Sequence, residues 1–304
     1  MKVPPDRSGV PTERVHPRGA GLDALPTTGL LALMSEEDER AACAVRAQTT
    51  RIAALVEDVV PRFRAGGRLI YVGAGTSGRL GVLDASECPP TFLVDPSRVV
   101  GIIAGGDAAL RRSSESLEDD LDGAKAELER LGVGKLDAVI GLTAGGTTPY
   151  PLGAIRFARS RGSLTALVTC GNPSDSRIAD HVVHLETGPE VLAGSTRLKA
   201  GTATKLVLNM ISTALMVRLG KVHDGLMVDV SATNDKLRDR AARIVVRLVG
   251  GSRAEALVLL DESGGRVKTA VVMCSLRVSR DEAEALLAAS DGSLRDALER
   301  GASC

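Results

Sequence analysis

The chain is 304 residues long and balanced in charge, with 38 basic and 38 acidic side chains and a formal net charge of zero. A zero net charge excludes a general electrostatic attraction to nucleic acid or to an anionic membrane, so any affinity for phosphate must be local. Aromatic residues make up only 2% of the chain, and Trp is absent. The core must therefore be built from Ala, Val, Leu and Ile, and the length suits one large α/β domain with a small appendage.

The cysteines and the apolar pattern bear on the cellular compartment. The five cysteines are scattered and include no C-x-x-C pair, which fits reduced thiols better than a disulfide framework. No apolar run approaches the roughly 20 residues that span a bilayer, and the N-terminus lacks the apolar core of a signal peptide. We expect a soluble, cytoplasmic protein.

Residues 1–34 are predicted to form an N-terminal arm. They are rich in Pro, Gly and Arg, which favours an extended segment over a packed one. The pattern Ser-Glu-Glu-Asp from Ser35 is typical of a capped helix start. The apolar periodicity that follows predicts one long helix ending at Gly66-Gly67.

Short apolar runs then alternate with helical segments. Such runs, without polar alternation, are typical of strands that are buried on both faces of a parallel sheet. They cover residues 69–72, 99–104, 138–143, 164–169 and 182–185. The sequence therefore predicts an α/β fold with helices on both faces of a parallel sheet, and ligands of such sheets bind at the carboxyl ends of the strands.

The last third of the chain is predicted to be helical. A long helix is expected over residues 199–219. Five short helical patterns follow, at residues 234–248, 253–260, 266–276, 280–288 and 293–300, separated by Gly, Ser or Asp caps. We therefore expect an arm (1–34), a sugar-phosphate-binding domain (35–230) and a small all-helical C-terminal domain (231–304).

The turn after the first predicted strand is rich in glycine and hydroxyl side chains. Gly75 and Gly78 flank Thr76 and Ser77, and Arg79 follows. Glycine allows close approach of the backbone, and the free N–H groups at a helix start favour an anion. The two hydroxyls add further hydrogen-bond donors, so the pattern predicts a phosphate-binding loop.

The same loop also matches the dinucleotide-binding fingerprint. Its spacing is Gly73-x-Gly75-x-x-Gly78, and Asp95 stands about 20 residues further on, where the ribose-binding acid is expected. Against a dinucleotide, Pro89-Pro90 should end the following helix after about three turns, because proline disfavours the helical conformation in the residue before it. The two hydroxyls also suit a monophosphate. A purely structural glycine turn is the third interpretation that the loop alone allows.

Two groups of carboxylates are candidates for acid–base chemistry. Glu87 stands near the end of the helix after the loop, and Glu115, Glu118 and Asp119 follow the second strand at spacings that share one helix face. Each has an ordinary alternative. Glu87 fits a solvated carboxylate before a turn, and the acidic cluster fits a solvated helix face.

A third polar group precedes the long helix. Its composition of hydroxyls, cations and glycine suits a second anion contact as well as an ordinary capped helix start. Its members are Glu190, Ser195, Thr196, Arg197 and Lys199. The four histidines form no metal-ligand pattern, so no metal site is expected.

Together these segments resemble the N-acetylmuramic acid 6-phosphate etherases, a family built on the sugar isomerase (SIS) fold. The resemblance rests first on residues 71–81, on Asp-Ala-Ser-Glu-Cys-Pro-Pro at 84–90 and on Ile-Ala-Gly-Gly at 103–106. Further matches lie at residues 188–205, 209–213, 226–230 and 232–234. The combination outweighs the dinucleotide alternative.

The resemblance implies a SIS-type three-layer fold and a lyase that needs no cofactor. Such an enzyme removes D-lactate from the ether at C3 of N-acetylmuramic acid 6-phosphate and leaves N-acetylglucosamine 6-phosphate during peptidoglycan recycling. Matching positions imply Glu87 as the proton donor to lactate and Glu118 as the base, with Glu115 and Asp119 as competing bases. The residues implied to bind the substrate and its phosphate are Gly75, Thr76, Ser77, Gly78, Arg79, Ser195, Thr196 and Lys199.

The resemblance also implies a homodimer, and the closeness of Glu87 and Glu118 in the sequence favours a site that takes both carboxylates from one chain. The sequence departs from the family after the third strand, where Gly145 and Thr147 replace the usual Ser and Arg. Because that Ser is expected to help hold the phosphate, we expect weaker phosphate binding or an altered substrate.

Two rival functions remain from the sequence. One is a sugar-phosphate-binding regulator of the glucokinase-regulator type, against which the presence of both Glu87 and Glu118 argues. The other is a sugar-phosphate isomerase of the same fold, which would move the C2 proton without releasing lactate.

Overall fold

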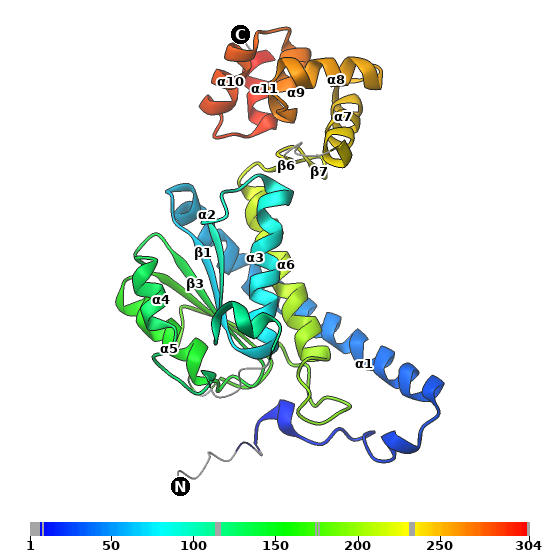
Figure 1. The fold of residues 1–304 in the computed structure, drawn as a ribbon, viewed down its shortest axis with the longest axis vertical. Helices are drawn as coiled ribbons and strands as arrows, with labels where there is room; N and C mark the ends of the chain where they lie inside the picture. Colours follow the sequence, from blue (N-terminus) through cyan, green and yellow to red (C-terminus); the bar gives the residue numbers. More distant parts are fainter. Residues whose placement is uncertain are drawn as a thin grey trace. The chain divides into compact units, whose positions relative to one another are not determined.

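The computed structural model describes residues 7, 9–112, 117–173, 175, 177–230 and 235–302 (Figure 1). The chain divides into two compact units. Unit 1 consists of Met1–Ser86 and Ser97–Ser212, and unit 2 consists of Glu87–Pro96 and Thr213–Cys304. The division passes through one helix, α3 (Gly75–Phe92).

Unit 1 is built on a five-stranded parallel sheet with the strand order β2-β1-β3-β4-β5. Every residue of β1, β3 and β4 is buried, because helices cover both faces of the sheet. The predicted parallel sheet is confirmed, and two of the predicted runs match their strands at both ends. The strands are β1 (Leu69–Gly73), β2 (Val99–Ile103), β3 (Ala138–Thr143), β4 (Leu164–Thr169) and β5 (His181–His184).

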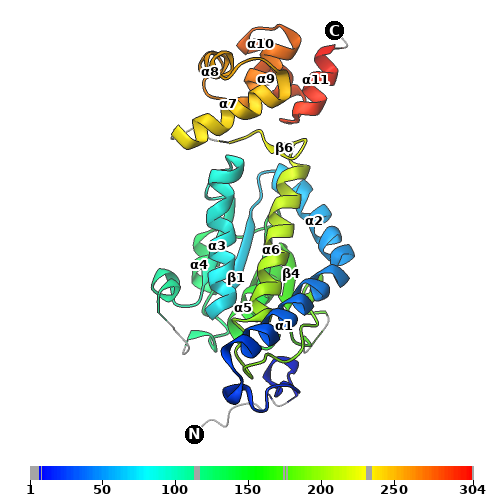
Figure 2. The same ribbon diagram turned by 90° about the vertical axis from the view of Figure 1, so that its right-hand side faces the viewer.

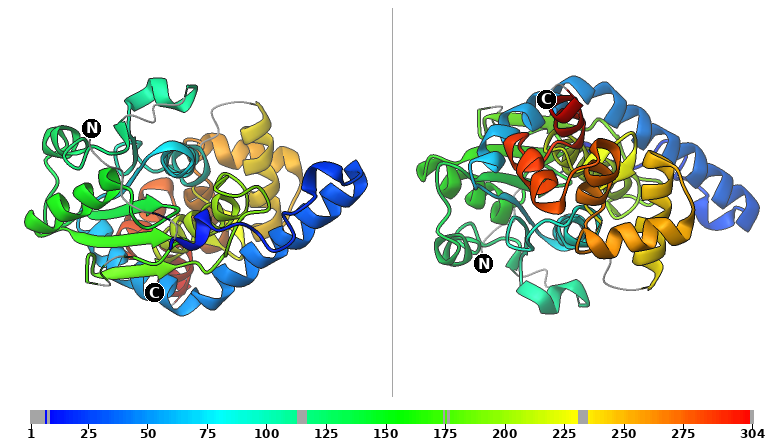
Figure 3. Two further views of the ribbon diagram at one scale, coloured as in Figure 1. Left: turned by 90° about the horizontal axis from the view of Figure 1, so that it is seen from below. Right: turned by 90° about the horizontal axis from the view of Figure 1, so that it is seen from above.

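The two faces of the sheet carry different helices, which makes three layers. Ile70 and Val139 share one buried cluster with Leu128 of α4 (Lys125–Arg130) and Ala154 of α5 (Pro149–Ser160). Side chains alternate along a strand, so Tyr71 points to the opposite face. There it meets α3, since a β-carbon added at Gly81 would lie 2.9 Å from the Tyr71 β-carbon. Figure 1 shows β1 and β3 between α3 on one side and α4 and α5 on the other, and Figure 2 shows α3 and α6 (Lys199–Arg218) in front of β1. Figure 3 gives two further views of the same elements.

Two helices stand where the sequence predicts one. They are α1 (Thr27–Ala47) and α2 (Thr49–Arg64), and Gln48 between them leaves the helical conformation at φ −102° and ψ 6°. The predicted start at Ser35 is wrong because Ser35 lies inside α1, which begins directly after Pro26. Proline favours the start of a helix, and this signal prevails over the capping pattern at Ser35.

Helix α3 is longer than the sequence predicts. Pro89 and Pro90 lie inside it, although they were expected to end it. The last turn survives because the Leu93 N–H still bonds to the Pro89 carbonyl at 3.0 Å. The helix then ends where Leu93 adopts a positive φ of 49°. The length of this helix therefore gives no argument against a dinucleotide, and the argument from the two hydroxyls remains.

Within the described residues, the acidic segment after β2 contains no α-helix before α4. A 3-10 turn, η3 (Gly106–Leu110), follows the strand. Leu117 is in 3-10 conformation, and turns with one irregular residue, Asp120, lead from there to the start of α4. The Asp120 carboxylate accepts the Asp122 N–H at 3.0 Å, a local bond that competes with helix formation. The predicted shared helix face of Glu118 and Asp119 is wrong, and Glu115 lies outside the described residues.

Helix α6 (Lys199–Arg218) has the length and apolar composition of a membrane-spanning helix, but 56% of its most apolar window is buried inside the protein. It is therefore a core helix, close to the predicted bounds. Ser212 of α6 donates to the Asp84 carboxylate of α3 at 3.1 Å, and the Tyr71 hydroxyl donates to the same carboxylate at 3.0 Å. Burial raises the pKa of Asp84, although these two hydrogen bonds oppose the rise.

Unit 2 holds a short hairpin and a group of five helices. In the hairpin, β6 (Val222–His223) pairs with β7 (Leu226–Met227) across Asp224 and Gly225, both at positive φ as such turns require. Ser252 and Ser279 each form a capping box at a helix start. The predicted C-terminal helices are present. They are α7 (Asp235–Val249), α8 (Arg253–Glu262), α9 (Val267–Leu276), α10 (Arg280–Ala289) and α11 (Leu294–Ala302).

Candidate functional site

The glycine loop joins β1 to the first turn of α3. Gly75 has φ +52°, a conformation that L side chains rarely adopt. A β-carbon at Gly73 would lie 2.8 Å from the Gly78 nitrogen, and one at Gly78 would lie 2.7 Å from the Gly73 carbonyl oxygen. The two segments touch, so both positions require glycine. The first N–H groups of α3 and the hydroxyls of Thr76 and Ser77 thus stand at the carboxyl end of β1.

A pocket of about 230 Å³ opens at this end of the sheet. Thr76, Ser77 and Thr196 line it together with Glu118, so four of the predicted site residues share one cavity. Its other lining residues are Arg7, Val10 and Glu13 of the arm, Ala74, Gly194 and the segment after β3, namely Leu142, Thr143, Ala144, Gly145, Thr147 and Thr148. Gly75, Gly78, Arg79, Ser195 and Lys199 are not in the lining. The polar lining suits a hydrophilic ligand with a phosphate at the loop end.

Glu118 reaches the pocket from a turn, and its backbone is fixed by α5. The Glu118 carbonyl accepts the Tyr150 N–H at 3.0 Å. Tyr150 is buried, and burial, with the negative charges of Glu127 and Asp120, raises the pKa of Tyr150 to about 12. Asp119, the neighbouring candidate base, lies 3.7 Å from Arg7 and does not line the pocket. Among the described carboxylates of the acidic segment, only Glu118 faces the pocket.

Glu87 is exposed, lies on α3 and is not among the residues that line the pocket. It follows Ser77 by about ten residues, which corresponds to about 15 Å along the axis of an α-helix.

Arg79 points away from the pocket and donates to the backbone beyond β2. Its Nε and Nη2 atoms each lie 3.4 Å from a carbonyl oxygen, of Leu110 and Arg112 respectively. These bonds tie the first turn of α3 to the segment after η3. The resemblance implied that Arg79 contacts the substrate, whereas its described contacts are with the protein.

Lys199 is buried and ion-paired rather than open to the pocket. Its Nζ atom contacts the carboxylate of Glu37 on α1, and the side chains of the two residues are 1% and 4% exposed. His16 and Arg40 lie 3.2 and 3.3 Å from the same carboxylate. Burial acts to raise the pKa of Glu37, but the hydrogen bond and charge of Lys199, with Arg40 and His16, lower it overall.

Sequence reasoning missed Glu37, although a signal for it exists. Leu33, Glu37, Ala41 and Val45 are the buried residues of α1, so the glutamate interrupts an apolar stripe at i, i+4 spacing.

Glu190 from the third polar group has a related structural role. Its carboxylate accepts the N–H groups of Lys199 and Ala200 at 3.2 and 2.9 Å and so caps α6.

The N-terminal arm forms part of the pocket, which the sequence did not predict. It contains two 3-10 turns, η1 (Pro11–Glu13) and η2 (Leu22–Ala24). Thr12 is fully buried and His16 is 3% exposed, so this segment packs against the rest of unit 1. No local pattern around Glu13 predicts this placement.

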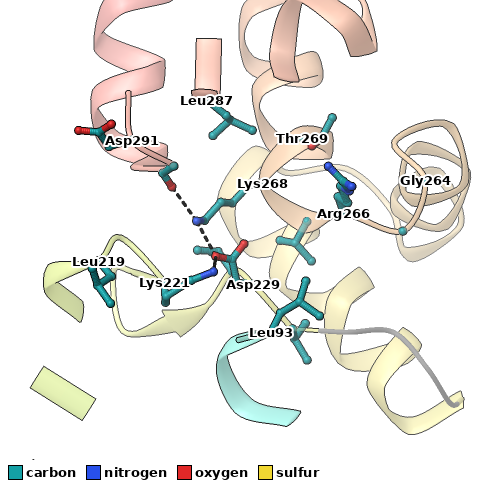
Figure 4. A pocket seen from close by; sticks show the side chains of 15 residues that line it. Leu93, Leu219, Lys221, Asp229, Gly264, Arg266, Lys268, Thr269, Leu287 and Asp291 are labelled. Atoms are coloured by element: carbon teal, nitrogen blue, oxygen red, sulfur yellow. Dashed lines mark hydrogen bonds and ion pairs between the residues drawn. The ribbon is translucent and has the colours of Figure 1, made fainter. Parts of the chain in front are cut away.

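Unit 2 contains a separate pocket of about 540 Å³ (Figure 4). Lys221 and Lys268 place their Nζ atoms 3.0 and 2.7 Å from the same Asp229 oxygen, and Lys268 also donates to the Gly292 carbonyl at 2.6 Å. Burial lowers the pKa of Lys268, and Asp229 opposes this change. Because the polar groups of both lysines are satisfied within the unit, we assign these contacts a structural role.

The chain is similar to known proteins over nearly its whole length. A family model described as the glucokinase regulatory protein N-terminal SIS domain matches residues 51–159. An N-acetylmuramic acid 6-phosphate etherase of Rubrobacter xylanophilus is 56% identical over 95% of this chain and 96% of its own length. The etherase of Trichormus variabilis is 52% identical over 96% of this chain and 96% of its own length. That of Cutibacterium acnes is 51% identical over 95% of this chain and 95% of its own length. Among solved structures, a phosphoheptose isomerase from Francisella tularensis aligns with a TM-score of 0.49 at 14% identity, over 64% of this chain and 100% of that one.

The parallel sheet and the hydroxyl-rich loop at the start of α3 define a SIS-domain protein. At these identities over nearly the whole length, the chain belongs to the N-acetylmuramic acid 6-phosphate etherase family. Family membership confirms the resemblance seen in the sequence.

Proposed function

We propose that the chain is a carbon–oxygen lyase that cleaves the lactyl ether of N-acetylmuramic acid 6-phosphate, giving N-acetylglucosamine 6-phosphate and D-lactate. The supporting observation is the pocket in which the hydroxyls of Thr76 and Ser77 lie with the carboxylate of Glu118. One end of this pocket suits a phosphate, and the other offers a base. The relatives carry the name of this reaction, and it belongs to the recycling of cell-wall amino sugars.

The reaction needs one base and one acid. In the open-chain sugar the C1 aldehyde acidifies the C2 proton, and the lactyl oxygen at C3 is a β leaving group. The base takes the C2 proton, the C2–C3 double bond forms, and the C3–O bond breaks as lactate receives a proton from the acid. Water then adds to C3 and returns a proton to C2. We assign the base to Glu118 and the acid to Glu87.

The phosphate is proposed to bind at the first turn of α3. Thr76 and Ser77 would donate their hydroxyls, and Thr196, which also lines the pocket, would donate a third. Gly75 and Gly78 would act through the backbone, because glycine lets the N–H groups of the loop approach the ligand. Arg79, Ser195 and Lys199 would act indirectly, by holding the starts of α3 and α6 in place.

We further propose a cytoplasmic homodimer in which the partner subunit supplies the acid. Glu87 of the same chain lies about 15 Å along α3 from the phosphate end, so one chain alone leaves its pocket without the acid. Most soluble oligomers have closed two-fold symmetry, which would complete both sites at once. We keep the domain division at residues 1–34, 35–230 and 231–304 as part of this proposal.

Incubation with N-acetylmuramic acid 6-phosphate, followed by enzymatic measurement of D-lactate and of N-acetylglucosamine 6-phosphate, tests the activity. The two products should appear in equal amounts. Exchange of the C2 proton with solvent without lactate release would support an isomerase instead. Binding without any turnover would support a regulator.

A further inference from the structure

We propose that Glu13 of the N-terminal arm is a substrate-binding residue, whose carboxylate accepts a hydrogen bond from a hydroxyl or amide N–H of the amino sugar. The proposal rests on the binding site described above. It adds a second carboxylate to the pocket that holds Glu118, at a position outside the paired acid and base.

The Glu13 side chain is available to a ligand. It is exposed, it lines the pocket, and within the part of the chain that the structure describes its carboxylate has no hydrogen-bond or ion-pair partner. Its Oε2 atom lies 3.4 Å from where a β-carbon at Gly194 would stand. A larger residue at position 194 would therefore crowd this carboxylate.

The arm holds Glu13 in place before any ligand binds. Its N–H bonds to the Val10 carbonyl at 3.0 Å within η1, and Thr12 beside it is fully buried. Further along, the Gly19 N–H bonds to the carbonyl of the buried His16 at 2.8 Å. A side chain on such an anchored segment loses little conformational entropy on binding, which favours a specific contact over a chance one.

The charges in the pocket determine which part of a ligand Glu13 meets. A carboxylate repels a phosphate dianion and accepts hydrogen bonds from hydroxyls and amides. The phosphate end of the pocket is the start of α3, where the hydroxyls and the positive end of the helix dipole lie. Glu13 therefore faces the sugar, and it selects for a ligand that carries a donor at the end away from its phosphate.

Binding of two ligands separates this role from a structural one. We would titrate Glu13→Ala, Glu13→Gln and wild-type protein with N-acetylglucosamine 6-phosphate and with inorganic phosphate by calorimetry. A hydrogen bond to a charged group predicts about 10-fold to 100-fold weaker binding of the amino sugar phosphate by Glu13→Ala, and a smaller loss for Glu13→Gln, which keeps an acceptor. Binding of inorganic phosphate should be unchanged or tighter.

Asp23→Asn is the matched control, since it removes an exposed carboxylate from the same arm outside the pocket. It should leave both affinities at the wild-type value. Amino sugar phosphate affinity within twofold of wild type in Glu13→Ala overturns the proposal, as does an equal loss for both ligands, which would indicate a displaced arm. Because binding of the product is measured without turnover, failure of lactate release in the wild type would count against the proposed reaction alone.

Discussion

A β-carbon at Gly145 would lie 3.8 Å from Oγ1 of Thr12 and 3.7 Å from Oγ1 of Thr147. Thr12 is fully buried, and its hydroxyl has no hydrogen-bond partner among the described residues. The resemblance seen in the sequence implies a Ser at the position of Gly145, and a serine Oγ would extend from the β-carbon toward these two hydroxyls. With glycine at position 145, the pocket lacks one hydroxyl donor, and the buried Thr12 hydroxyl lacks a hydrogen-bond partner among the described residues.

We predict that Gly145→Ser tightens phosphate binding. Gly145 has no positive φ and its β-carbon position is open to within ordinary contact distance, so the side chain fits without backbone strain. One added hydrogen bond is worth about 1 kcal/mol, which lowers the KM for the sugar phosphate about fivefold. Gly146→Ser is the control, because Gly146 has φ +78° and neighbours at 3.0 Å, and this variant should lose stability instead. A KM that stays the same in Gly145→Ser would contradict the role given to position 145.

The double variant Thr76→Ala/Ser77→Ala should raise KM and leave kcat nearly unchanged. The phosphate keeps its contacts from the bound state to the transition state, so losing them weakens both equally. Ser86→Ala on the same helix is the control, since Ser86 is exposed and its hydroxyl donates to the Leu83 carbonyl at 2.8 Å. Steady-state kinetics would contradict the loop assignment if the double variant kept the wild-type KM.

The sequence predicted best where one strong constraint decides the structure. The bounds of β3 and β4 were predicted to the residue. Both are short, uninterrupted apolar runs, which are typical of a central parallel strand buried on both faces. The loop was predictable because Gly73 and Gly78 touch, which only glycine allows. The failures involve competing local signals. Pro26 prevails over Ser35 for the start of α1, and an Asp120 side-chain bond replaces the expected helix at Glu118.

Contacts between distant segments could not be predicted at all. The placement of Glu13 in the pocket depends on how the arm folds back on unit 1, and no local pattern encodes that path. The same holds for Lys199. A lysine among hydroxyls and glycines before a helix is typical of an anion-binding site, but the Lys199 side chain forms an ion pair with Glu37, far away in the sequence. The sequence does not distinguish a lysine that binds an anionic ligand from a lysine that forms a structural ion pair, because the partner is not encoded locally.

Lys199→Met should therefore lower stability rather than substrate affinity. Removing one partner of a buried ion pair leaves the other charge unpaired and typically costs about 3–5 kcal/mol. The double variant Glu37→Leu/Lys199→Met should recover a large part of that loss, because it also removes the carboxylate that had lost its lysine. Urea denaturation measures all three variants. A Lys199→Met protein with wild-type stability and a raised KM would show that Lys199 contacts the substrate.

The Arg68–Asp137 pair should make the fold sensitive to acid. Arg68 Nη2 lies 2.8 Å from the Asp137 carboxylate, which also accepts the Gly134 N–H at 2.9 Å. Burial acts to raise the pKa of Asp137, but these hydrogen bonds and the Arg68 charge lower it overall. A lowered carboxylate pKa stabilises the fold above about pH 4, the usual unfolded value, and this contribution is lost as the pH falls through the lower folded value.

Asp137→Asn should accordingly melt at a lower temperature than wild type at pH 7 and lose less further stability between pH 5 and pH 3. Thermal unfolding followed by circular dichroism across this range measures both. Asp23→Asn, on an exposed arm position, should follow the wild-type profile. Parallel pH profiles for wild type and Asp137→Asn would show that this pair does not govern the acid response.

The origin of the acid in each site can be tested with mixed dimers. Glu87→Gln and Glu118→Gln each remove one proton-transfer group and should lower lactate release about 10²- to 10⁴-fold as homodimers. The two chains would be co-expressed with different affinity tags, so that the mixed dimer is isolated by two purification steps.

If the partner subunit supplies Glu87, the mixed dimer has one site with both carboxylates intact and one with neither, and it should show about half of the wild-type activity. If each chain supplies both of its own carboxylates, both sites of the mixed dimer are defective and activity stays at the level of the single variants. Light scattering should first give a mass near twice 31.6 kDa, and a fully active monomer on dilution would contradict the dimer and the shared site together.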